Sequence, residues 1–201
     1  MKRLLALAWV ALALLVAGCG RSLAPVPPLR TPSPIVVATA LPDGWAALQQ
    51  VPLQIPTLTP GEVCPVVPGI QVNPNMGDAL GAGPLFLVGL GAQGALDLSQ
   101  ASQQNGEYSM LILLTAPPGY TTNMLVRGRQ MDGPNAVLFF SRSVGSEPLD
   151  QLQLTPDAAG TSADWLTWSA YLVVSGPGCY GLQIDSAGFS EVIVFRAVKA
   201  A

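Results

Sequence analysis

The chain has 201 residues, of which only 10% are charged; nine lysines and arginines stand against twelve aspartates and glutamates, for a formal net charge of −3. This mildly acidic balance, without a block of basic residues, argues against nucleic acid as a partner. The chain contains no histidine, which excludes Ser-His-Asp and Cys-His catalysis and the usual histidine proton shuttle.

The first nineteen residues have the pattern of a secretory signal. Lys2 and Arg3 precede an uncharged apolar run over residues 4–17, and small residues follow up to Cys19. A charged start, a short apolar core and small residues before a cleavage site are typical of a signal peptide. The run is shorter than the roughly 20 apolar residues that span a bilayer. We expect residues 1–18 to be removed on export, which leaves seven basic side chains against twelve acidic ones.

The end of this signal, Val16-Ala17-Gly18-Cys19, resembles the lipobox of bacterial lipoproteins. In that family the cysteine is acylated on sulfur, the bond before it is cut, and the lipidated cysteine becomes the first residue; the resemblance implies this role for Cys19. Two or more acyl chains make such an anchor stable. The resemblance also implies that Gly20, in place of an aspartate, does not specify retention at the inner membrane. The expected location is extracytoplasmic, on the cell membrane or on the outer membrane if there is one. An ordinary signal with an incidental cysteine, or an uncleaved anchor, is the alternative.

Residues 19–60 are predicted to be the lipidated cysteine and a proline-rich tether. Proline fixes φ and removes a hydrogen-bond donor, so such a segment does not stay long in a helix or a central strand. Residues 45–58 have enough apolar side chains to form a short helical turn and lie against the domain that follows. The prolines are Pro25, Pro27, Pro28, Pro32, Pro34, Pro42, Pro52, Pro56 and Pro60.

Residues 61–201 are predicted to form one all-β domain. Short runs rich in apolar, β-branched and aromatic residues alternate with Gly, Pro and Asn turns. This spacing favours an antiparallel β-sandwich of Ig-like or Greek-key type with seven or eight strands, and a barrel is the second choice. A helical turn is expected only within residues 158–163. The predicted strands are 84–90, 107–115, 123–130, 136–141, 149–154, 165–174, 180–185 and 191–198.

The last two predicted strands form a hairpin joined by residues 186–188. In the final strand Ile193 and Phe195 point to one face, while Val192 and Val194 point to the other. Apolar residues on both faces predict a strand that is covered on both sides. We therefore expect the last strand to lie at the centre of the fold.

This ending, the motif RGRQMDG at residues 127–133 and the pair Cys64-Pro65 resemble the β-domains of uncharacterised lipoproteins from bacteria of high GC content. The similarity extends over residues 45–197. It implies an exported β-domain and supplies no activity and no catalytic residue.

Cys64 and Cys179 remain once Cys19 is assigned to the lipid. Disulfides form and persist in exported proteins. We predict a bond that ties the start of the domain to its penultimate strand. Two buried free thiols are the alternative.

Residues with catalytic or metal-binding chemistry are few. The chain has no Gly-x-Ser-x-Gly elbow, phosphate loop or dinucleotide fingerprint. Zinc or copper would have only Cys64, Cys179 and carboxylates as ligands, which is a poor set. We predict no catalytic residue, no metal and no cofactor. A hydrolase with two facing carboxylates remains an alternative, because such pairs meet in space and not in sequence.

Arg127 and Arg129 form, with Asp132, the one charge-dense motif. Alternation along a strand places both arginines on one face, where two guanidinium groups could bind a carboxylate, a sugar or a phosphate of a surface polymer. The alternative is that they pair with Asp132, Asp185 or Glu191 and bridge strands.

Trp165, Trp168 and Tyr120 are the candidate sugar-binding aromatics. Three positions apart on a strand, the two tryptophans point to opposite faces, so we expect one in the core and the other at the surface or an edge. Tyr120 follows a Pro-Pro-Gly turn. A carbohydrate platform would require two or three of the aromatic rings to be coplanar.

Together these features predict a membrane-anchored extracytoplasmic lipoprotein whose β-domain is not an enzyme and acts in binding or assembly. Its partner would be a cell-envelope polymer, a protein or a substrate being imported. A purely structural envelope component is the second interpretation, and a carboxylate-based glycoside hydrolase is the third.

Overall fold

The computed structural model describes residues 44–91, 93–140 and 147–199. The chain divides into two units, Met1–Thr39 and Ala40–Ala201, and every described residue belongs to the second. The predicted signal peptide, Cys19 and the first part of the predicted tether lie outside the described residues. No helix in the described part of the chain is long and apolar enough to cross a membrane.

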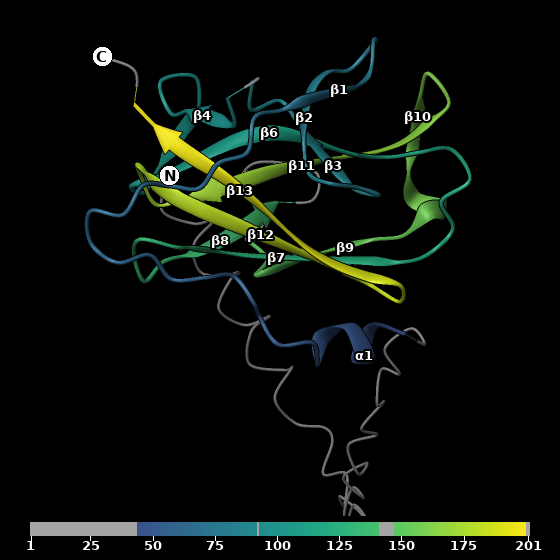
Figure 1. Cartoon of the computed structure of the whole chain (residues 1–201), viewed down its shortest axis with the longest axis horizontal. Coiled ribbons are helices and arrows are strands. Elements are labelled where there is room, and N and C mark those ends of the chain that lie inside the picture. The colour runs from purple at the N-terminus through teal and green to yellow at the C-terminus, as the bar shows by residue number, and fades with distance from the viewer. Residues whose placement is uncertain (1–43, 92, 141–146, 200–201) are drawn as a thin grey trace, which may run out of the picture. The chain divides into compact units, whose positions relative to one another are not determined.

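The described residues form thirteen strands and two short helices, which confirms the prediction of an all-β domain (Figure 1). The α-helix α1 covers Trp45–Gln49, and the 3₁₀-helix η1 covers Pro156–Ala158. The strands are β1 (Ile70–Asn73), β2 (Gly77–Leu80), β3 (Phe86–Val88), β4 (Ala95–Asp97), β5 (Ser102–Gln104), β6 (Glu107–Ala116), β7 (Met124–Gln130), β8 (Ala136–Phe140), β9 (Gln151–Leu154), β10 (Gly160–Ser162), β11 (Trp165–Val174), β12 (Gly178–Ser186) and β13 (Phe189–Val198).

All thirteen strands belong to one curled sheet, whose main path is β1-β2-β3-β6-β11-β8-β7-β12-β13-β4. β5, β9 and β10 lie off this path and pair with β6, β7 and β11. β8 turns the corner: Val137 pairs with Gly128 of β7, whereas Phe139 pairs with Leu172 of β11. The sheet therefore has two halves, one with β6 and β11 and the other with β7, β12 and β13 (Figure 1).

The hydrophobic core fills the space between these two halves. Leu114 of β6 and Leu172 of β11 are fully buried, and they belong to the same cluster as Leu182 of β12 and Phe195 of β13. Each strand contributes alternate residues to this inner face, as a period of two requires. Removal of this apolar surface from water is the main favourable term that holds the two halves together.

All eight predicted strands are present within two residues of their expected bounds, but the predicted number is too low. β1, β2, β4, β5 and β10 were not predicted, and β4 pairs with β13 in parallel. Each of these strands has three or four residues, and every residue of β5 and β10 is exposed. A strand that is exposed throughout carries no alternation of buried and exposed positions by which it could be recognised.

Residues 158–163 are the one place where the sequence allowed a helical turn, and only Ala158 of these residues is helical. η1 ends at Ala158, and Gly160–Ser162 pair with β11 as β10. Pro156 at the start of η1 fixes the local backbone, and the residues that follow find a strand partner instead of continuing the turn.

β12, and not the last strand, is covered on both faces. Eight of its nine residues are buried. β13 lies between β12 and the short β4, so it is not central. Its inner residues Ile193 and Phe195 are buried as predicted, whereas Val192 on the other face is 36% exposed.

Residues 45–58, which we call the strap, form a short helix and pack on the domain, as the sequence predicts. Trp45 and Leu48 of α1 are 2% and 8% exposed, and they form a small cluster with Leu125 of β7. The strap supplies part of the cover over the outer face of β7 and β12.

Replacing Trp45 with alanine should destabilise the domain by about 3 kcal/mol, because truncation of a buried tryptophan typically costs 3–5 kcal/mol. Leu53→Ala is the matched control within the strap: Leu53 is 46% exposed, so its loss should change stability by less than about 0.5 kcal/mol. Urea unfolding measures both. Equal losses in the two variants would contradict the docking of α1 on β7.

Candidate functional site

The strap crosses the outer face of β7 and β12, opposite the core. At one end Leu48 packs with Leu125, and at the other the N–H of Leu58 donates to the carbonyl of Met131 at 2.7 Å. The strap therefore advances in the same direction as β7. It places backbone that contains Pro52 and Pro56 over the side chains that the two strands point away from the core.

Arg127 bridges the strap and β12. Its Nη2 donates to the carbonyl oxygen of Val51 at 2.7 Å and to Asp185 Oδ2 at 2.6 Å. The side chain of Asp185 is 1% exposed, and its Oδ1 also accepts from Ser190 Oγ at 2.7 Å and from Gln183 Nε2 at 3.0 Å. A cation and two neutral donors thus satisfy this carboxylate, as a buried charge requires.

Arg129 and Gln183 hold the strap by its backbone. Arg129 Nη2 donates to the carbonyl oxygen of Ile55. Gln183 Nε2 donates to the carbonyl of Pro52 at 3.0 Å, and Gln183 Oε1 accepts from the N–H of Gln54 at 2.5 Å. The side-chain amide and the guanidinium therefore satisfy polar backbone groups of an extended segment that has no strand partner of its own.

The structure thus places Arg127 and Arg129 in the attachment of the strap. Arg127 pairs with Asp185, one of the three acids named in the strand-bridging interpretation. Asp132 takes another role, because its carboxylate accepts from Gln130 and from the backbone of Cys179. Donors of both arginines are directed to the protein's own backbone.

Gly181 of β12 allows the strap to approach closely. A Cβ at this position would lie 2.6 Å from Ile55 Cγ2, a separation that real contacts do not reach. Ile55 is 2% exposed and packs in one cluster with Leu58, Met131 and Cys179. A side chain at position 181 would push the strap away from the sheet.

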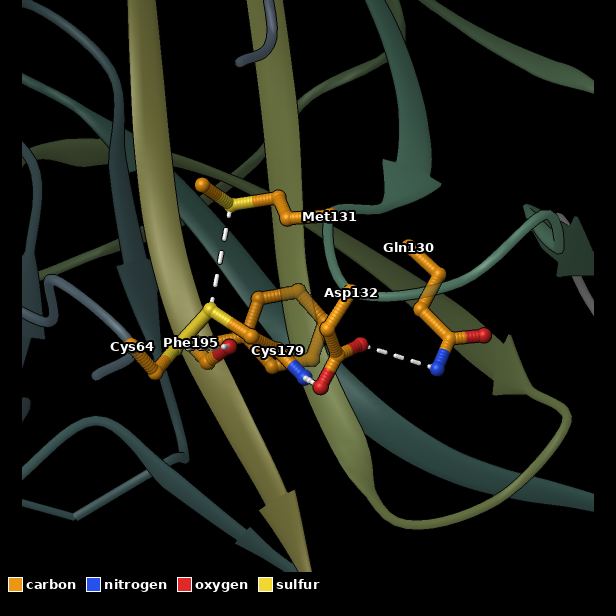
Figure 2. Close-up of a disulfide and its surroundings, with 6 residues drawn as sticks. All are labelled: Cys64, Gln130, Met131, Asp132, Cys179 and Phe195. Atoms are coloured by element: carbon orange, nitrogen blue, oxygen red, sulfur yellow. Dashed lines mark hydrogen bonds between the residues drawn. A yellow bond between two sulfur atoms is a disulfide. The ribbon is translucent and has the colours of Figure 1, made fainter. Parts of the chain in front are cut away.

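A disulfide ties the chain to β12 just after the strap. Cys64 and Cys179 are bonded with a Cα–Cα distance of 5.5 Å, the pairing that the sequence predicts (Figure 2). Asp132 Oδ2 accepts from the N–H of Cys179 at 3.0 Å, and Asp132 Oδ1 accepts from Gln130 Nε2 at 2.9 Å (Figure 2). The sulfur of Met131 lies 3.8 Å from Cys179 Sγ. In the chain-entropy model a bond that closes 115 residues stabilises by about 4–5 kcal/mol.

The three candidate aromatics have separate surroundings. Trp168 is 7% exposed, and its Nε1 donates to the carbonyl of Thr155 at 2.9 Å. Trp165 is half-buried on the opposite face of β11, as alternation predicts. The hydroxyl of Tyr120 lies 2.9 Å from Ser186 Oγ, at the end of β12. They have no common partner in the described contacts.

A pocket of about 740 Å³ lies between β9, β10 and β11. Trp168 and Tyr171 line it together with the polar side chains of Gln153, Thr167 and Ser169. This volume lies within the range of about 300–1,000 Å³ that is typical of small-molecule pockets. Aromatic rings beside hydroxyl and amide groups can stack on and hydrogen-bond to an amphipathic ligand such as a sugar.

Sequence analysis missed Gln153, Ser169 and Gln183. All three could have been recognised from the period of two, because each lies between two apolar residues of its strand: Gln153 in β9, Ser169 in β11 and Gln183 in β12. Alternation identifies them as outward-facing but cannot say that one faces the strap and the others a pocket.

Within residues 44–91, 93–140 and 147–199, no three His, Cys, Asp or Glu side chains are grouped so as to hold a metal ion. Comparisons of the chain with protein-family models, curated proteins and solved structures find no match. The function is therefore argued from the residues and their geometry.

Replacing Arg127 with methionine should destabilise the protein by about 3–5 kcal/mol, because it leaves the buried Asp185 carboxylate without its cation. Arg129→Met is the matched control: it removes hydrogen bonds to neutral oxygens, for an expected loss of about 1 kcal/mol. Urea unfolding gives both values. In the Arg127→Met background, Asp185→Asn should recover part of the loss. Equal losses of stability for the two arginine variants, with no recovery by Asp185→Asn, would show that the ion pair between Arg127 and Asp185 does not stabilise the protein.

Proposed function

We propose that this protein is an exported lipoprotein, anchored through Cys19 to the cell membrane or to an outer membrane, whose β-domain binds a component of the cell envelope and is not an enzyme. The signal-like residues 1–18 and the lipobox that ends at Cys19 support the anchor. The disulfide between Cys64 and Cys179 supports export, because such bonds persist in oxidising compartments.

The observation that carries the proposal is the fastening of the strap. A chain that comes from a membrane anchor enters the domain through residues 45–58, which are held by Arg127, Arg129 and Gln183 and are followed by a disulfide. Such an attachment suits a domain that is held in place by its N-terminal end. A purely structural envelope component would use the same attachment, and it remains the second candidate.

The pocket between β9, β10 and β11 favours binding over a purely structural role. We propose that it receives a carbohydrate-containing envelope polymer, with Tyr171 as the apolar contact and Gln153 as a hydrogen-bonding group. We also propose that the curled sheet be classed with antiparallel β-sandwiches, because its halves pack across one core and one strand pair alone is parallel among the described residues.

The anchor is tested by lipid labelling in cells. Wild-type protein should incorporate labelled palmitate and fractionate with membranes, whereas Cys19→Ser should do neither, because the acylated sulfur is gone. Globomycin, which blocks lipoprotein signal peptidase, should cause the wild-type precursor to accumulate. Processing that is insensitive to globomycin, or palmitate in the Cys19→Ser variant, would contradict the anchor.

The pocket is tested by retention of envelope polysaccharide on immobilised protein. Tyr171→Ala should reduce retention about tenfold. Loss of one aromatic contact weakens each binding site by on the order of 1 kcal/mol, and the effect is multiplied because one polymer chain binds several protein molecules at once. Gln71→Ala on β1, which is exposed and far along the sheet path from β11, should retain as much as wild type. If wild type retains no polysaccharide, the purely structural interpretation is favoured.

A further inference from the structure

A second pocket, of about 340 Å³, lies where the two ends of the curled sheet approach each other. On one side are Val192 and Ile193 of β13, and on the other are Ile70 of β1 and Leu80 of β2. One edge of β13 pairs with β12 along its length, whereas its other edge pairs with β4 only at residues 196–198. The pocket therefore occupies a gap between sheet edges that the described strands leave unpaired.

The walls of this pocket are apolar and accessible. Val67, Ile70 and Val192 are 72%, 54% and 36% exposed, and they are three of the seven large apolar side chains that are exposed in the described part of the chain. Such side chains are normally scattered singly over a surface, and a group of them indicates a binding surface. This group lines a concave site, not a flat face.

Glu191 brings a carboxylate to the same pocket. Its Oε2 accepts from the N–H of Ala82 at 3.2 Å, whereas its Oε1 is buried and has no hydrogen-bond partner. Gly81 allows the loop after β2 to fold back closely on Leu85. It has φ +122°, and a Cβ at this position would lie 2.9 Å from the carbonyl oxygen of Leu85. Burial of a carboxylate that has few donors is unfavourable for its ionised form, and a positive charge nearby would compensate it.

Burial raises the pKa of Glu191 to about 7, and the N–H groups of Ala82 and Gly83 act in the opposite direction. The other described residues that line the pocket carry no titratable side chain. On β12, Ile184 is the register partner of Glu191, and the neighbouring Asp185 is already paired with Arg127. No described cation compensates this carboxylate, so the site is complementary to a positive charge.

We propose that this pocket binds a small amphiphilic primary amine, whose ammonium group pairs with the carboxylate of Glu191 and whose hydrocarbon chain packs against the apolar lining to which Val67, Ile70 and Val192 belong. An ammonium provides the positive charge that no described group of the pocket supplies. An apolar chain of a few carbons suits the walls and the volume, and a carboxylate ligand would be repelled. The site is separate from the pocket between β9, β10 and β11 and does not depend on the proposed function.

The affinity for an amine should depend on pH, because the carboxyl group of Glu191 changes its charge in the neutral range. An ammonium binds the ionised form of Glu191, and about a tenth of the molecules carry that form at pH 6 against about nine tenths at pH 8. Affinity for the amine should therefore rise about tenfold from pH 6 to pH 8. An alcohol of the same chain length should show no such rise.

The test is calorimetric titration of the purified protein with hexylammonium chloride, with hexanol as the uncharged probe. At pH 8 wild type should bind hexylammonium more tightly than hexanol. Glu191→Gln should weaken hexylammonium binding at least tenfold and leave hexanol binding unchanged. Glu147→Gln, which changes an exposed glutamate, is the matched control and should behave as wild type. Absence of hexylammonium binding, or equal binding by Glu191→Gln and wild type, would overturn the proposal.

A second measurement does not require a variant. The Glu191 carboxyl carbon can be followed by NMR in wild-type protein as pH is varied, with and without hexylammonium. The midpoint should fall when the amine is present, because the cation favours the ionised carboxylate. A midpoint that hexylammonium leaves unchanged would also overturn the proposal, whatever the stability of Glu191→Gln.

Discussion

The docking of the strap on β7 and β12 is the constraint on which the rest of this structure depends. β12 points Gln183 and Asp185 away from the core, yet both are buried, because the strap covers them. A buried amide and a buried carboxylate require partners, and the strap requires donors for its free carbonyl groups. Arg127 satisfies both requirements at once by binding Asp185 and the carbonyl of Val51. Two sets of polar groups, neither stable in the interior alone, are thus satisfied by each other.

The order of contacts along the strap would have a mechanical consequence under the proposed membrane anchor. A pull on the chain before Gly44 would first load the apolar contact of Trp45 with Leu125, and then the hydrogen bonds to Arg127 and Arg129. The covalent bond at Cys64 would be loaded last. Each non-covalent contact is worth a few kcal/mol at most, so the disulfide limits how far the chain can be peeled. Beyond this point the pull would be transmitted through the disulfide to β12.

Both pockets lie where strand pairing changes or stops. β9 pairs with β7 while β10 pairs with β11, and the larger pocket lies among β9, β10 and β11. The smaller pocket lies beside the part of β13 that β4 does not cover. A curled sheet that does not close leaves such gaps because side chains, and not a further strand, must fill them. The aromatic and polar lining of the first gap and the apolar lining with Glu191 of the second make them chemically different sites.

The sequence by itself determined the all-β class, eight of the thirteen strands and the pairing of Cys64 with Cys179, since alternation, turn residues and the number of cysteines are local or countable properties. It also indicated that residues 45–58 would lie against the domain. Only the tertiary structure decided that Arg127 binds Asp185, that β12 is the doubly covered strand, and that Glu191 meets Ile70 and Leu80 across a gap. These contacts join residues 58 to more than 100 positions apart. Side-chain chemistry states which partners such residues need, but only the path of the folded chain selects among them.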